Sequence, residues 1–303
     1  MKILLTGGSG QLGSEIKKII PKNITLLYPN RKELDLSDNN SIKKIVSKFK
    51  PDWVINCGAY TNVDKAEREI ELAYQINASA LKTLAESLST SKGKILHIST
   101  DYVFNGENFK PYKTTDQRSP IGIYGKSKSK GEEFLEDFLK TRNKGIILRT
   151  SWVIGSYGNN FALKMIELHN KKDYISVVSD QIGCPTSANK LAKVCWEIIC
   201  KSEEIDFKTN VGIMHWSDSG AASWYDLAIS VGEIGKELGL IKNKAHVIPV
   251  KSEEYLTAAK RPYYSLLDCS STKKIINVTS LHWQKELEET LKSFKSNNQT
   301  FAK

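Results

Sequence analysis

The stretch TGGSGQLG, residues 6–13, decides how the rest of this sequence is interpreted. It follows the apolar run Lys2–Thr6 directly and leads into an amphipathic stretch. Its glycines Gly7, Gly10 and Gly13 have the spacing GxxGxxG. A glycine turn between a strand and a helix brings backbone N–H groups and the positive end of the helix close to a phosphate. We therefore predict the pyrophosphate-binding turn of a dinucleotide cofactor, rather than a glycine-rich turn that binds nothing.

Short β-rich runs alternate with helical patterns through the first half of the chain, which is typical of βαβ units around a parallel sheet. The expected strands are Lys2–Thr6, Ile24–Leu27, Trp53–Cys57, Lys94–Ser99 and Gly145–Thr150. The expected helices are Gly10–Ile20, Ser41–Phe49, Ala66–Leu88 and Tyr124–Leu139. This order predicts an α/β fold with a Rossmann-type doubly wound parallel sheet.

After Thr150 the alternation becomes looser, with a short run at Ile175–Val178 and helices near Ala188–Cys200 and Ser223–Leu238. We predict a dinucleotide-binding domain over residues 1–150. Residues 151–303 are expected to form a smaller C-terminal α/β domain that mainly binds the substrate, with segments that could return to the sheet.

Composition excludes several classes of protein. The 303 residues include 40% hydrophobic and 26% charged side chains, as in an ordinary globular protein, and no run has the length of a membrane span. The five cysteines are scattered and lack a CxxC pair, which favours a reducing cytoplasm over a disulfide framework or a zinc site. Only six of the 44 basic residues are arginines, and the lysines are dispersed, so we do not expect nucleic-acid binding. The net charge of +10 could still attract phosphate-bearing ligands.

The end of the second expected strand bears on cofactor choice. Cofactors without a 2′-phosphate usually meet an acidic residue there, whereas this chain has Arg31. Arg31 could bind the 2′-phosphate of NADPH through a charge-assisted fork, or it could be a surface arginine, in which case NADH is possible. Asp35 and Leu36 stand where the adenine would lie, although Asp35 could equally be a turn or capping residue.

Tyr124 and Lys128 are four residues apart in YGKSK, where a helix is expected to begin, so they share one helix face. A tyrosine can protonate a forming alkoxide when a nearby lysine cation makes its phenolate accessible. Lys128 could also contact the nicotinamide ribose. Such a pair is common on helix surfaces, and only the surrounding sequence favours a catalytic role.

Thr100 and Asp101 follow the fourth expected strand, at the edge of the sheet where doubly wound folds bind ligands. Thr100 could donate a hydrogen bond to a substrate carbonyl or could simply cap the end of the strand. Asp101 could equally be a turn residue.

Several segments together resemble the dTDP-4-dehydrorhamnose reductase family of the extended short-chain dehydrogenase/reductase superfamily. They occur in the expected order over nearly the whole chain: TGGSGQLG, INCGAYTNVDKAE from Ile55, STDYVFNG from Ser99, SPIGIYGKSKSKGE from Ser119, RTSWVIG from Arg149, GNNF from Gly158, DQIGCPT from Asp180 and KRPYYSLLD from Lys260. STDYVF, RTSWV and DQxGxPT are more specific than the glycine turn.

The resemblance implies a role for particular residues. Gly10, Gln11 and Leu12 would lie at the pyrophosphate, Ala59, Tyr60 and Thr61 would line the cofactor cleft, and Thr100, Tyr124 and Lys128 would form the catalytic group. Thr100, Asp101 and Trp152 would face the sugar. An indole suits a sugar because it offers an apolar face and an N–H donor, although a tryptophan is more often part of the core.

The chain also departs from the family pattern. Tyr264 stands where the family often has an asparagine after the RP segment, so the contact with the nucleotide could differ. Some members use a glutamate cluster for magnesium at a dimer interface, and Glu15 matches one of its positions. The other expected position reads Asn189 and Lys190, and a lysine repels a cation. We therefore predict no metal, and either a monomer or a homodimer.

These observations predict NADPH-dependent reduction of the 4-keto group of dTDP-4-dehydro-L-rhamnose to dTDP-L-rhamnose. A reductase or epimerase of another nucleotide sugar is an alternative, because the fold and the catalytic group serve many substrates. A cofactor-binding regulatory subunit without turnover is a second alternative, which the presence of Thr100, Tyr124 and Lys128 disfavours.

Overall fold

The computed structural model describes the chain except for residues 90, 143–144, 203, 205–211 and 301–303. Within the described part, six parallel strands form the central sheet in the order β2-β1-β3-β4-β5-β10. They are β1 (Lys2–Thr6), β2 (Thr25–Leu27), β3 (Trp53–Asn56), β4 (Lys94–Thr100), β5 (Gly145–Thr150) and β10 (Ile213–Trp216). The prediction of a doubly wound parallel α/β fold is confirmed.

The strand order changes direction between β1 and β3. From β1 the chain first adds β2 on one side and then returns to place β3 on the other side. In such sheets the connections leave opposite faces at this point, so a crevice opens at the carboxyl ends of the two strands. The glycine turn after β1 lies at this crevice.

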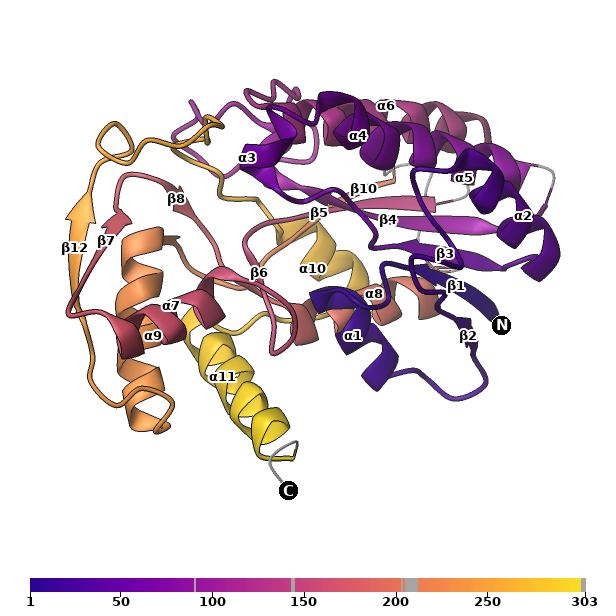
Figure 1. Ribbon diagram of the computed structural model, residues 1–303. Coiled ribbons are helices and arrows are strands. Elements are labelled where there is room, and N and C mark those ends of the chain that lie inside the picture. Colours follow the sequence, from indigo (N-terminus) through magenta and orange to yellow (C-terminus); the bar gives the residue numbers. More distant parts are fainter. Residues whose placement is uncertain (90, 143–144, 203, 205–211, 301–303) are drawn as a thin grey trace.

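Helices cover both faces of the sheet (Figure 1). One face carries α1 (Gln11–Lys18), α8 (Ala188–Cys200) and α10 (Ser270–Ile276). The other carries α2 (Asn39–Phe49), α3 (Val63–Ala66), α4 (Ile70–Tyr74), η1 (Gln75–Ser79), α5 (Ala80–Ser89) and α6 (Ile123–Arg142). Within β1, Ile3 and Leu5 pack toward α1 and α8, whereas Leu4 packs toward α2 and α5. The strands are apolar on both faces because both faces are covered.

A second layered unit lies to the left of the sheet in Figure 1. Its strands and helices are α7 (Phe161–Lys171), β7 (Tyr174–Val178), α9 (Trp224–Glu237), β12 (His246–Val250) and α11 (Trp283–Thr300). Short pairs connect it to the sheet: β6 (Val153–Ile154) with β9 (Thr186–Ser187), and β8 (Ile182–Gly183) with β11 (Ala222–Ser223). This unit has its own core, which includes Ile166, Leu227, Val231 and Leu287.

Three segments from the second half of the chain, α8, β10 and α10, belong to the unit built on the central sheet. Strand β10 extends the sheet by pairing with β5 in register from Ile213 with Ile147 to Trp216 with Thr150. Helix α8 packs against α1, and the Trp196 indole donates to the Ile16 carbonyl of that helix at 3.2 Å. The chain therefore crosses between the two units more than once.

One expected helix is interrupted. The amphipathic stretch Ala66–Leu88 is divided by the π-helical turn η1 between α4 and α5. The extra residue in this turn directs Asn77 inward, where its side chain accepts from the Tyr60 N–H at 2.9 Å and donates to the Tyr60 carbonyl at 3.1 Å. It also donates to Ser127 of α6 at 3.0 Å. The turn thus ties the loop after β3 to the start of α6, and π turns are frequent at functional sites.

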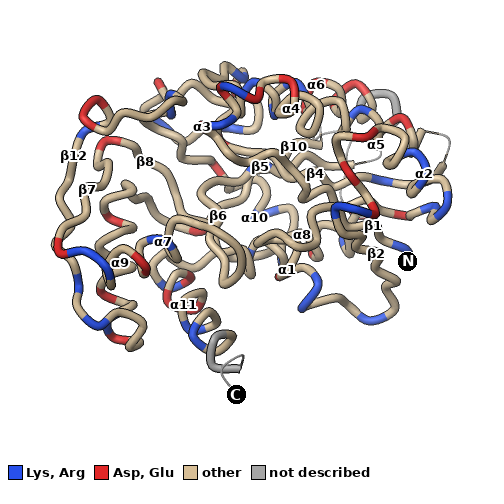
Figure 2. Tube along the Cα trace, viewed as in Figure 1, with Lys and Arg blue, Asp and Glu red and all other residues tan. Residues whose placement is uncertain are grey.

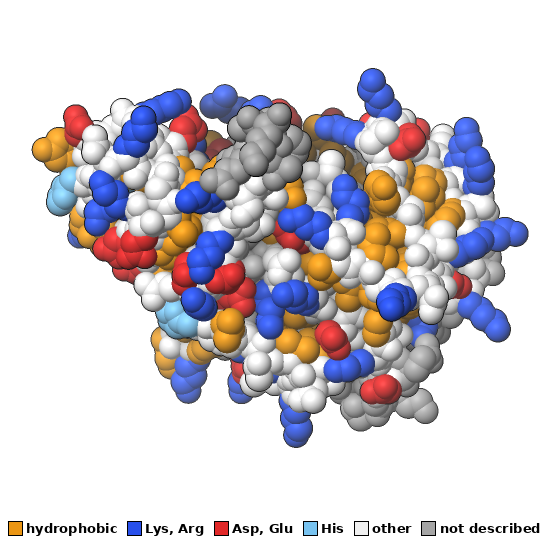
Figure 3. Space-filling view, turned by 90° about the horizontal axis from the view of Figure 1, so that it is seen from below, with side chains coloured by type: hydrophobic (Ala, Val, Ile, Leu, Met, Phe, Trp, Pro, Cys, Tyr) orange, Lys and Arg blue, Asp and Glu red, His pale blue; other side chains and the backbone are white. Residues whose placement is uncertain are grey.

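The surface charge is mixed rather than gathered in one block. Lys and Arg occur along both units and alternate with Asp and Glu (Figure 2). Seen from below, single lysine and arginine side chains project between apolar and uncharged areas (Figure 3). The five cysteines, all in the described part, are free thiols. No described helix combines the length and the apolar character that a membrane span requires.

Candidate active site

The glycine turn has a backbone that other residues could not adopt. Gly7 has a φ of +67°, and a Cβ on it would lie 2.6 Å from the backbone nitrogen of Gly58. A side chain on Gly13 would collide with the Gly7 carbonyl, which allows α1 to approach the turn closely. Gly10 is the N-cap of α1 and has no capping side chain. The N–H groups and the positive end of this helix are thus presented to a ligand, as a dinucleotide pyrophosphate requires.

A cavity of about 670 Å³ extends from this turn along the carboxyl ends of β3, β4 and β5. It brings together most of the residues that the sequence singled out: Gly7, Gly10, Gln11, Leu12, Arg31, Asp35, Leu36, Ala59, Thr61, Thr100, Asp101, Tyr124, Lys128 and Trp152. The shape and the donors of the cavity fit a dinucleotide. Gly13 and Tyr60 do not line it.

Tyr60 faces away from the cavity. Its hydroxyl donates to Glu69 at 2.7 Å, and its backbone groups are held by Asn77. Gly13 contributes through the packing of α1 against the turn instead of through a wall of the cavity.

Arg31 and Asp35 lie at the outer end of the cavity. The Arg31 side chain is exposed. One carboxylate oxygen of Asp35 accepts from the N–H and the hydroxyl of Ser37, at 2.9 and 2.8 Å, and these bonds lower the pKa of Asp35, with Arg31 adding to the effect. Asp35 therefore makes a turn as well as lining the cavity, while the cap of α2 is Asp38.

Thr100, Asp101 and Tyr124 meet at the end of β4. The Thr100 hydroxyl donates to Asp101 at 3.0 Å and accepts from the Tyr102 N–H at 3.2 Å. Thr100 also acts on the Tyr124 hydroxyl, whose pKa it lowers. Thr100 therefore caps the short helix η2 (Asp101–Val103) while also lying at the cavity.

Desolvation sets the protonation of this group. It raises the pKa of Tyr124 to about 12, with the Asp101 carboxylate adding to the rise and Thr100 opposing it. Burial also raises the pKa of Asp101 to about 7, against hydrogen bonds from Ser265 and Thr100. Tyr124 is thus protonated at neutral pH, as a proton donor must be, whereas Asp101 titrates in the neutral range.

The Lys128 amine is buried beside Tyr124 on α6. Its Nζ donates to the Ile98 carbonyl at 2.7 Å and lies 3.1 Å from Nε2 of His97. Burial lowers the pKa of Lys128 to about 8, while Glu132, one turn further along α6, raises it. Lys128 is therefore an ammonium ion at neutral pH and loses its proton as the pH rises through about 8.

Glu132 belongs to a buried ion network that sequence reasoning missed. Its carboxylate accepts from Arg149 of β5 at 2.7 Å and from Arg118 at 2.9 Å, and Arg118 also pairs with Glu136 at 2.6 Å. Burial opposes ionisation of Glu132, but Arg149 and Arg118 hold its pKa below its ordinary value. The network fixes the position of α6 on the sheet under the catalytic pair.

Trp152 lies at the boundary between two cavities. Its backbone has a φ of +46°, and its ring stacks on Trp224 with centroids 3.6 Å apart and planes 6° apart. Trp152 lines the cofactor cavity, while Trp224 lines a second cavity of about 1160 Å³. Residues other than glycine that have a left-handed backbone often lie at functional sites. Trp152 is partly exposed, unlike the core residue Trp216.

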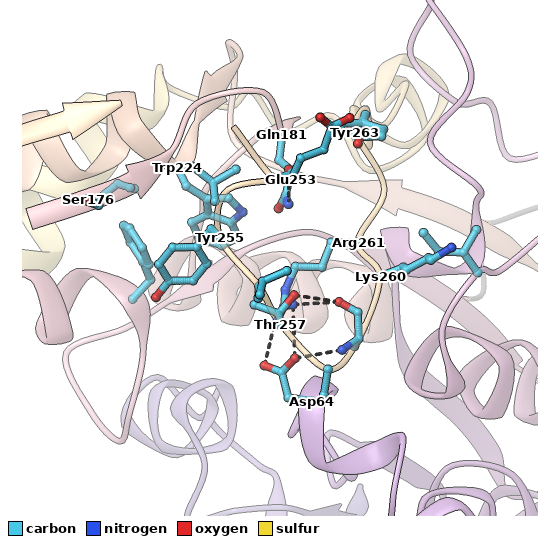
Figure 4. A pocket seen from close by; sticks show the side chains of 18 of the residues that line it. Asp64, Ser176, Gln181, Trp224, Glu253, Tyr255, Thr257, Lys260, Arg261 and Tyr263 are labelled. Atoms are coloured by element: carbon cyan, nitrogen blue, oxygen red, sulfur yellow. Dashed lines mark hydrogen bonds and ion pairs between the residues drawn. The ribbon is translucent and has the colours of Figure 1, made fainter. Parts of the chain in front are cut away.

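The second cavity lies between α7, α9, β7 and the segment 252–263 (Figure 4). Trp224 and Tyr255 stand on one side of it, and Arg261 stands on the other. The Arg261 guanidinium pairs with Asp64 of α3 at 2.6 Å, and its Nη1 donates to the Ala259 carbonyl at 3.0 Å. Segment 252–263 is therefore tied to the sheet unit across the cavity.

Glu15, which matches a magnesium position in the family, has other partners here. Its two carboxylate oxygens accept from Ser156 at 3.1 Å, Asn189 at 3.0 Å and Lys18 at 3.4 Å. Hydrogen-bond donors occupy the oxygens that a cation would need, so these residues do not fit a metal site. Among the described residues, no group of three His, Cys, Asp or Glu side chains could hold a metal ion.

Comparison with known proteins identifies a family model and relatives that match nearly the whole chain. A family model described as the RmlD substrate binding domain matches residues 1–296. A dTDP-4-dehydrorhamnose reductase of Aggregatibacter actinomycetemcomitans is 38% identical over 95% of this chain and 97% of its own. The spore coat polysaccharide biosynthesis protein SpsK of Bacillus subtilis is 36% identical, with 96% of each chain covered.

A solved structure extends this similarity to the fold. The dTDP-4-dehydrorhamnose reductase of Bacillus anthracis, in complex with NADP, superposes with a TM-score of 0.87 at 34% identity, covering 96% of this chain and 99% of that one. The fold and the relatives together define a Rossmann-type oxidoreductase. Within that class, the chain belongs to the dTDP-4-dehydrorhamnose reductase family.

Proposed function

We propose that this protein reduces the 4-keto group of dTDP-4-dehydro-L-rhamnose with NADPH and forms dTDP-L-rhamnose. The observation that carries the proposal is the convergence of Thr100, Tyr124 and Lys128 on the cavity that begins at the glycine turn. NADPH, when bound, supplies the hydride. The B. anthracis relative, which was solved with NADP, supports this choice of cofactor.

Each side chain of the group has a separate task. Thr100 turns its hydroxyl from Asp101 to the 4-keto oxygen and donates a hydrogen bond that polarises the carbonyl. Tyr124 gives its proton to the alkoxide that forms there, because its raised pKa keeps the hydroxyl protonated until then. Lys128 stabilises the resulting phenolate and directs an N–H toward the nicotinamide ribose. Catalysis by this group depends on orientation and on stabilisation of the oxyanion.

The substrate would extend across both cavities. Asp101 and Trp152 face the sugar, and the second cavity, beyond the Trp152–Trp224 stack, holds the nucleotide. Its volume of about 1160 Å³ and its aromatic and cationic lining suit a nucleoside diphosphate. Residues 1–150 would then mainly bind the cofactor, and residues 151–303 mainly the substrate, apart from α8, β10 and α10. A cytoplasmic location and a possible homodimer remain predictions from the sequence.

Turnover assays with a small panel of 4-keto nucleotide sugars test the proposal. The protein should oxidise NADPH with dTDP-4-dehydro-L-rhamnose, seen as a loss of absorbance, and the product should be dTDP-L-rhamnose by NMR. Binding of NADPH without turnover of any sugar would instead identify a regulatory subunit.

One relative favours a second candidate substrate of the same chemical type. A protein of Streptomyces niveus that is 30% identical over 94% of this chain is named dTDP-4-keto-6-deoxy-D-glucose reductase. It differs from the relatives named dTDP-4-dehydrorhamnose reductase in the sugar that its name specifies, so that sugar belongs in the panel. Faster turnover of it than of dTDP-4-dehydro-L-rhamnose would reassign the substrate.

Arg31→Ala tests the choice of cofactor. Arg31 is exposed and lines the outer end of the cofactor cavity. Loss of a charge-assisted bond to the 2′-phosphate should weaken NADPH binding by about 10-fold, with little change for NADH. Titration of cofactor fluorescence gives both dissociation constants. Lys32→Ala is the control, because Lys32 is the adjacent exposed cation and does not line the cavity. Equal losses for the two cofactors would remove Arg31 from this role.

Trp152→Ala tests the contact with the sugar. We expect KM for the nucleotide sugar to rise about 10-fold, because the substrate loses a stacking surface, with only a modest fall in melting temperature. Trp216→Ala provides the comparison, since Trp216 is fully buried and its truncation should cost about 3–5 kcal/mol of stability. If the two variants lose similar stability and Trp152→Ala keeps its KM, then Trp152 is a core residue.

A further inference from the structure

His97 occupies an unusual place for a histidine. It stands in the middle of the central strand β4, its side chain is fully buried, and it does not line either cavity. Its Nε2 lies 3.1 Å from Nζ of Lys128, and its Nδ1 lies 3.0 Å from the amide nitrogen of Asn56 on the neighbouring strand β3. A polar ring at such a position needs partners, and one of them is the lysine of the catalytic group.

The contacts continue to the glycine turn. The Thr6 hydroxyl, at the end of β1, lies 2.5 Å from Oδ1 of Asn56 and accepts from the Gly58 N–H at 3.1 Å. Lys128, His97, Asn56 and Thr6 therefore form a row of hydrogen-bonded side chains across three strands and α6. The row starts at the catalytic helix and ends at the turn where the pyrophosphate would bind.

The hydrogen bonds along this row can be arranged in two ways, with donors and acceptors exchanged. An ammonium group only donates, so when Lys128 is charged, Nε2 of His97 must accept and the ring proton must sit on Nδ1. For this, the Asn56 amide must turn over from its orientation in the structure, so that its oxygen accepts from Nδ1 and its nitrogen donates to Thr6. In the opposite direction, which is the arrangement in the structure, Thr6 donates to Asn56 and the Asn56 amide donates to Nδ1. The proton on Nε2 is then given to an uncharged Lys128 amine. Each direction matches one protonation state of Lys128.

We propose that His97 is a positioning residue that holds Lys128 as an ammonium ion directed into the cofactor cavity, and that the Asn56 amide turns its oxygen to Nδ1 and so selects the tautomer that accepts from Lys128. Of the three N–H bonds of the ammonium, one goes to the Ile98 carbonyl and one to Nε2 of His97. The third is left for the cavity. A side-chain amide does not pass a proton on, so the row orients and stabilises but does not conduct protons. This inference rests on the proposed function in so far as Lys128 serves the reaction.

The charged and titratable groups around Lys128 come from several elements. Burial lowers the pKa of Lys128, whereas Glu132 on α6 and Cys57 after β3 oppose that effect. Burial keeps the pKa of the Cys57 thiol high, so it is uncharged at neutral pH. Burial and the Lys128 charge hold the pKa of His97 well below its ordinary value, so its ring is neutral. Tyr124 on α6 and Asp101 after β4 complete the set. Among these groups, His97 is the one whose ring nitrogen lies within hydrogen-bond distance of the amine.

Comparison of His97→Leu with His97→Gln tests the proposal. Leucine removes the acceptor, so Lys128 should lose its proton at lower pH. NADPH binding at pH 8 should weaken about 10-fold, and the alkaline limb of its pH profile should move down by about one pH unit. His97→Gln can offer a carbonyl oxygen to Lys128 and should recover most of the loss. Cofactor fluorescence measures this binding without any sugar.

Two further variants separate positioning from structure. His169→Leu is the matched control, because His169 is equally buried but bonds only the Ala228 carbonyl in the second unit. It should lower the melting temperature without moving the pH profile. Asn56→Leu should move the alkaline limb of the pH profile of NADPH binding in the same direction as His97→Leu. Nδ1 then loses the Asn56 oxygen as its acceptor, and the ring proton shifts to Nε2. Asn56→Leu also tests the proposal if His97→Leu does not fold.

Each result either supports the role of His97 or overturns it. A pH profile that stays unchanged in His97→Leu, or in Asn56→Leu where His97→Leu does not fold, overturns the proposal and makes His97 a structural residue. Equal losses in the leucine and glutamine variants would also overturn it. If the profile moves as expected while no 4-keto sugar is reduced, the role of His97 stands and the proposed function fails.

Discussion

Replacing Tyr124 with phenylalanine is expected to lower kcat by about 10²–10⁴-fold while the fold and NADPH binding survive. The change removes only the hydroxyl, and the ring keeps its edge-on contact with Tyr102 at 5.8 Å between centroids. The hydroxyl is the group that the raised pKa keeps protonated beside Thr100. Single-turnover measurements under saturating NADPH would report the chemical step, and Tyr102→Phe, on the adjacent ring, should retain near-normal kcat.

The rival proton donor is Asp101, and pH separates the two. Because the pKa of Asp101 is raised to about 7, a reaction that depended on its proton would lose rate as the pH rises through 7. A reaction that depends on Tyr124 should keep its rate until Lys128 loses its proton near pH 8. Near-normal kcat in Tyr124→Phe, together with a large loss in Asp101→Asn, would transfer the role to Asp101.

Lys128→Met is the second change with a large expected effect. It should weaken NADPH binding about 10-fold or more and lower kcat about 10²-fold or more, since the ammonium is proposed to contact the ribose and to stabilise the phenolate. Methionine has a similar length and buries no charge, and Glu132 keeps Arg149 and Arg118 as partners. The Ile98 carbonyl and Nε2 of His97 lose their partner, so the free energy of unfolding should fall by about 1–3 kcal/mol while the fold persists.

The control for this variant lies on the same helix. Lys126→Met removes an exposed lysine two residues earlier in α6 and should leave both constants unchanged. Measurement of the NADPH dissociation constant and of kcat for both variants separates the two roles of Lys128. A loss of kcat with unchanged NADPH binding would remove the ribose contact and leave only the effect on Tyr124.

Strands β1 to β5 were predictable because a buried parallel strand is an apolar run bounded by turn residues, whereas β10 was not predicted as a strand. Lys2–Thr6 and Gly145–Thr150 occur with the predicted bounds. Helix α8 was also predicted with its bounds, but its packing on α1 was not, since sequence periodicity shows an apolar face without showing its partner. The π turn at Gln75–Ser79 was missed because one extra residue hardly alters the amphipathic pattern around it.

The catalytic group was visible in the sequence because Tyr124 and Lys128 are close along one helix. The groups that support it were not, because they come from distant segments. His97 lies 31 residues before Lys128, and Arg149 lies 17 residues after Glu132. A signal was nevertheless present: His97 interrupts the apolar run 95–98, and Asn56 ends the otherwise apolar strand β3. A buried polar residue in a central strand needs a partner, so it marks a site worth examining.

The return of β10 to the sheet limits how this protein can be recombined. A chain cut after Thr150 would leave β5 as an open edge, ready to pair with other chains, and would uncover the apolar surface that α8 protects. A chimera that exchanged everything after that point with a relative would import a foreign sheet strand along with the foreign pocket. New sugar specificity is therefore better grafted through segment 252–263, which borders the second cavity and carries no strand of the sheet.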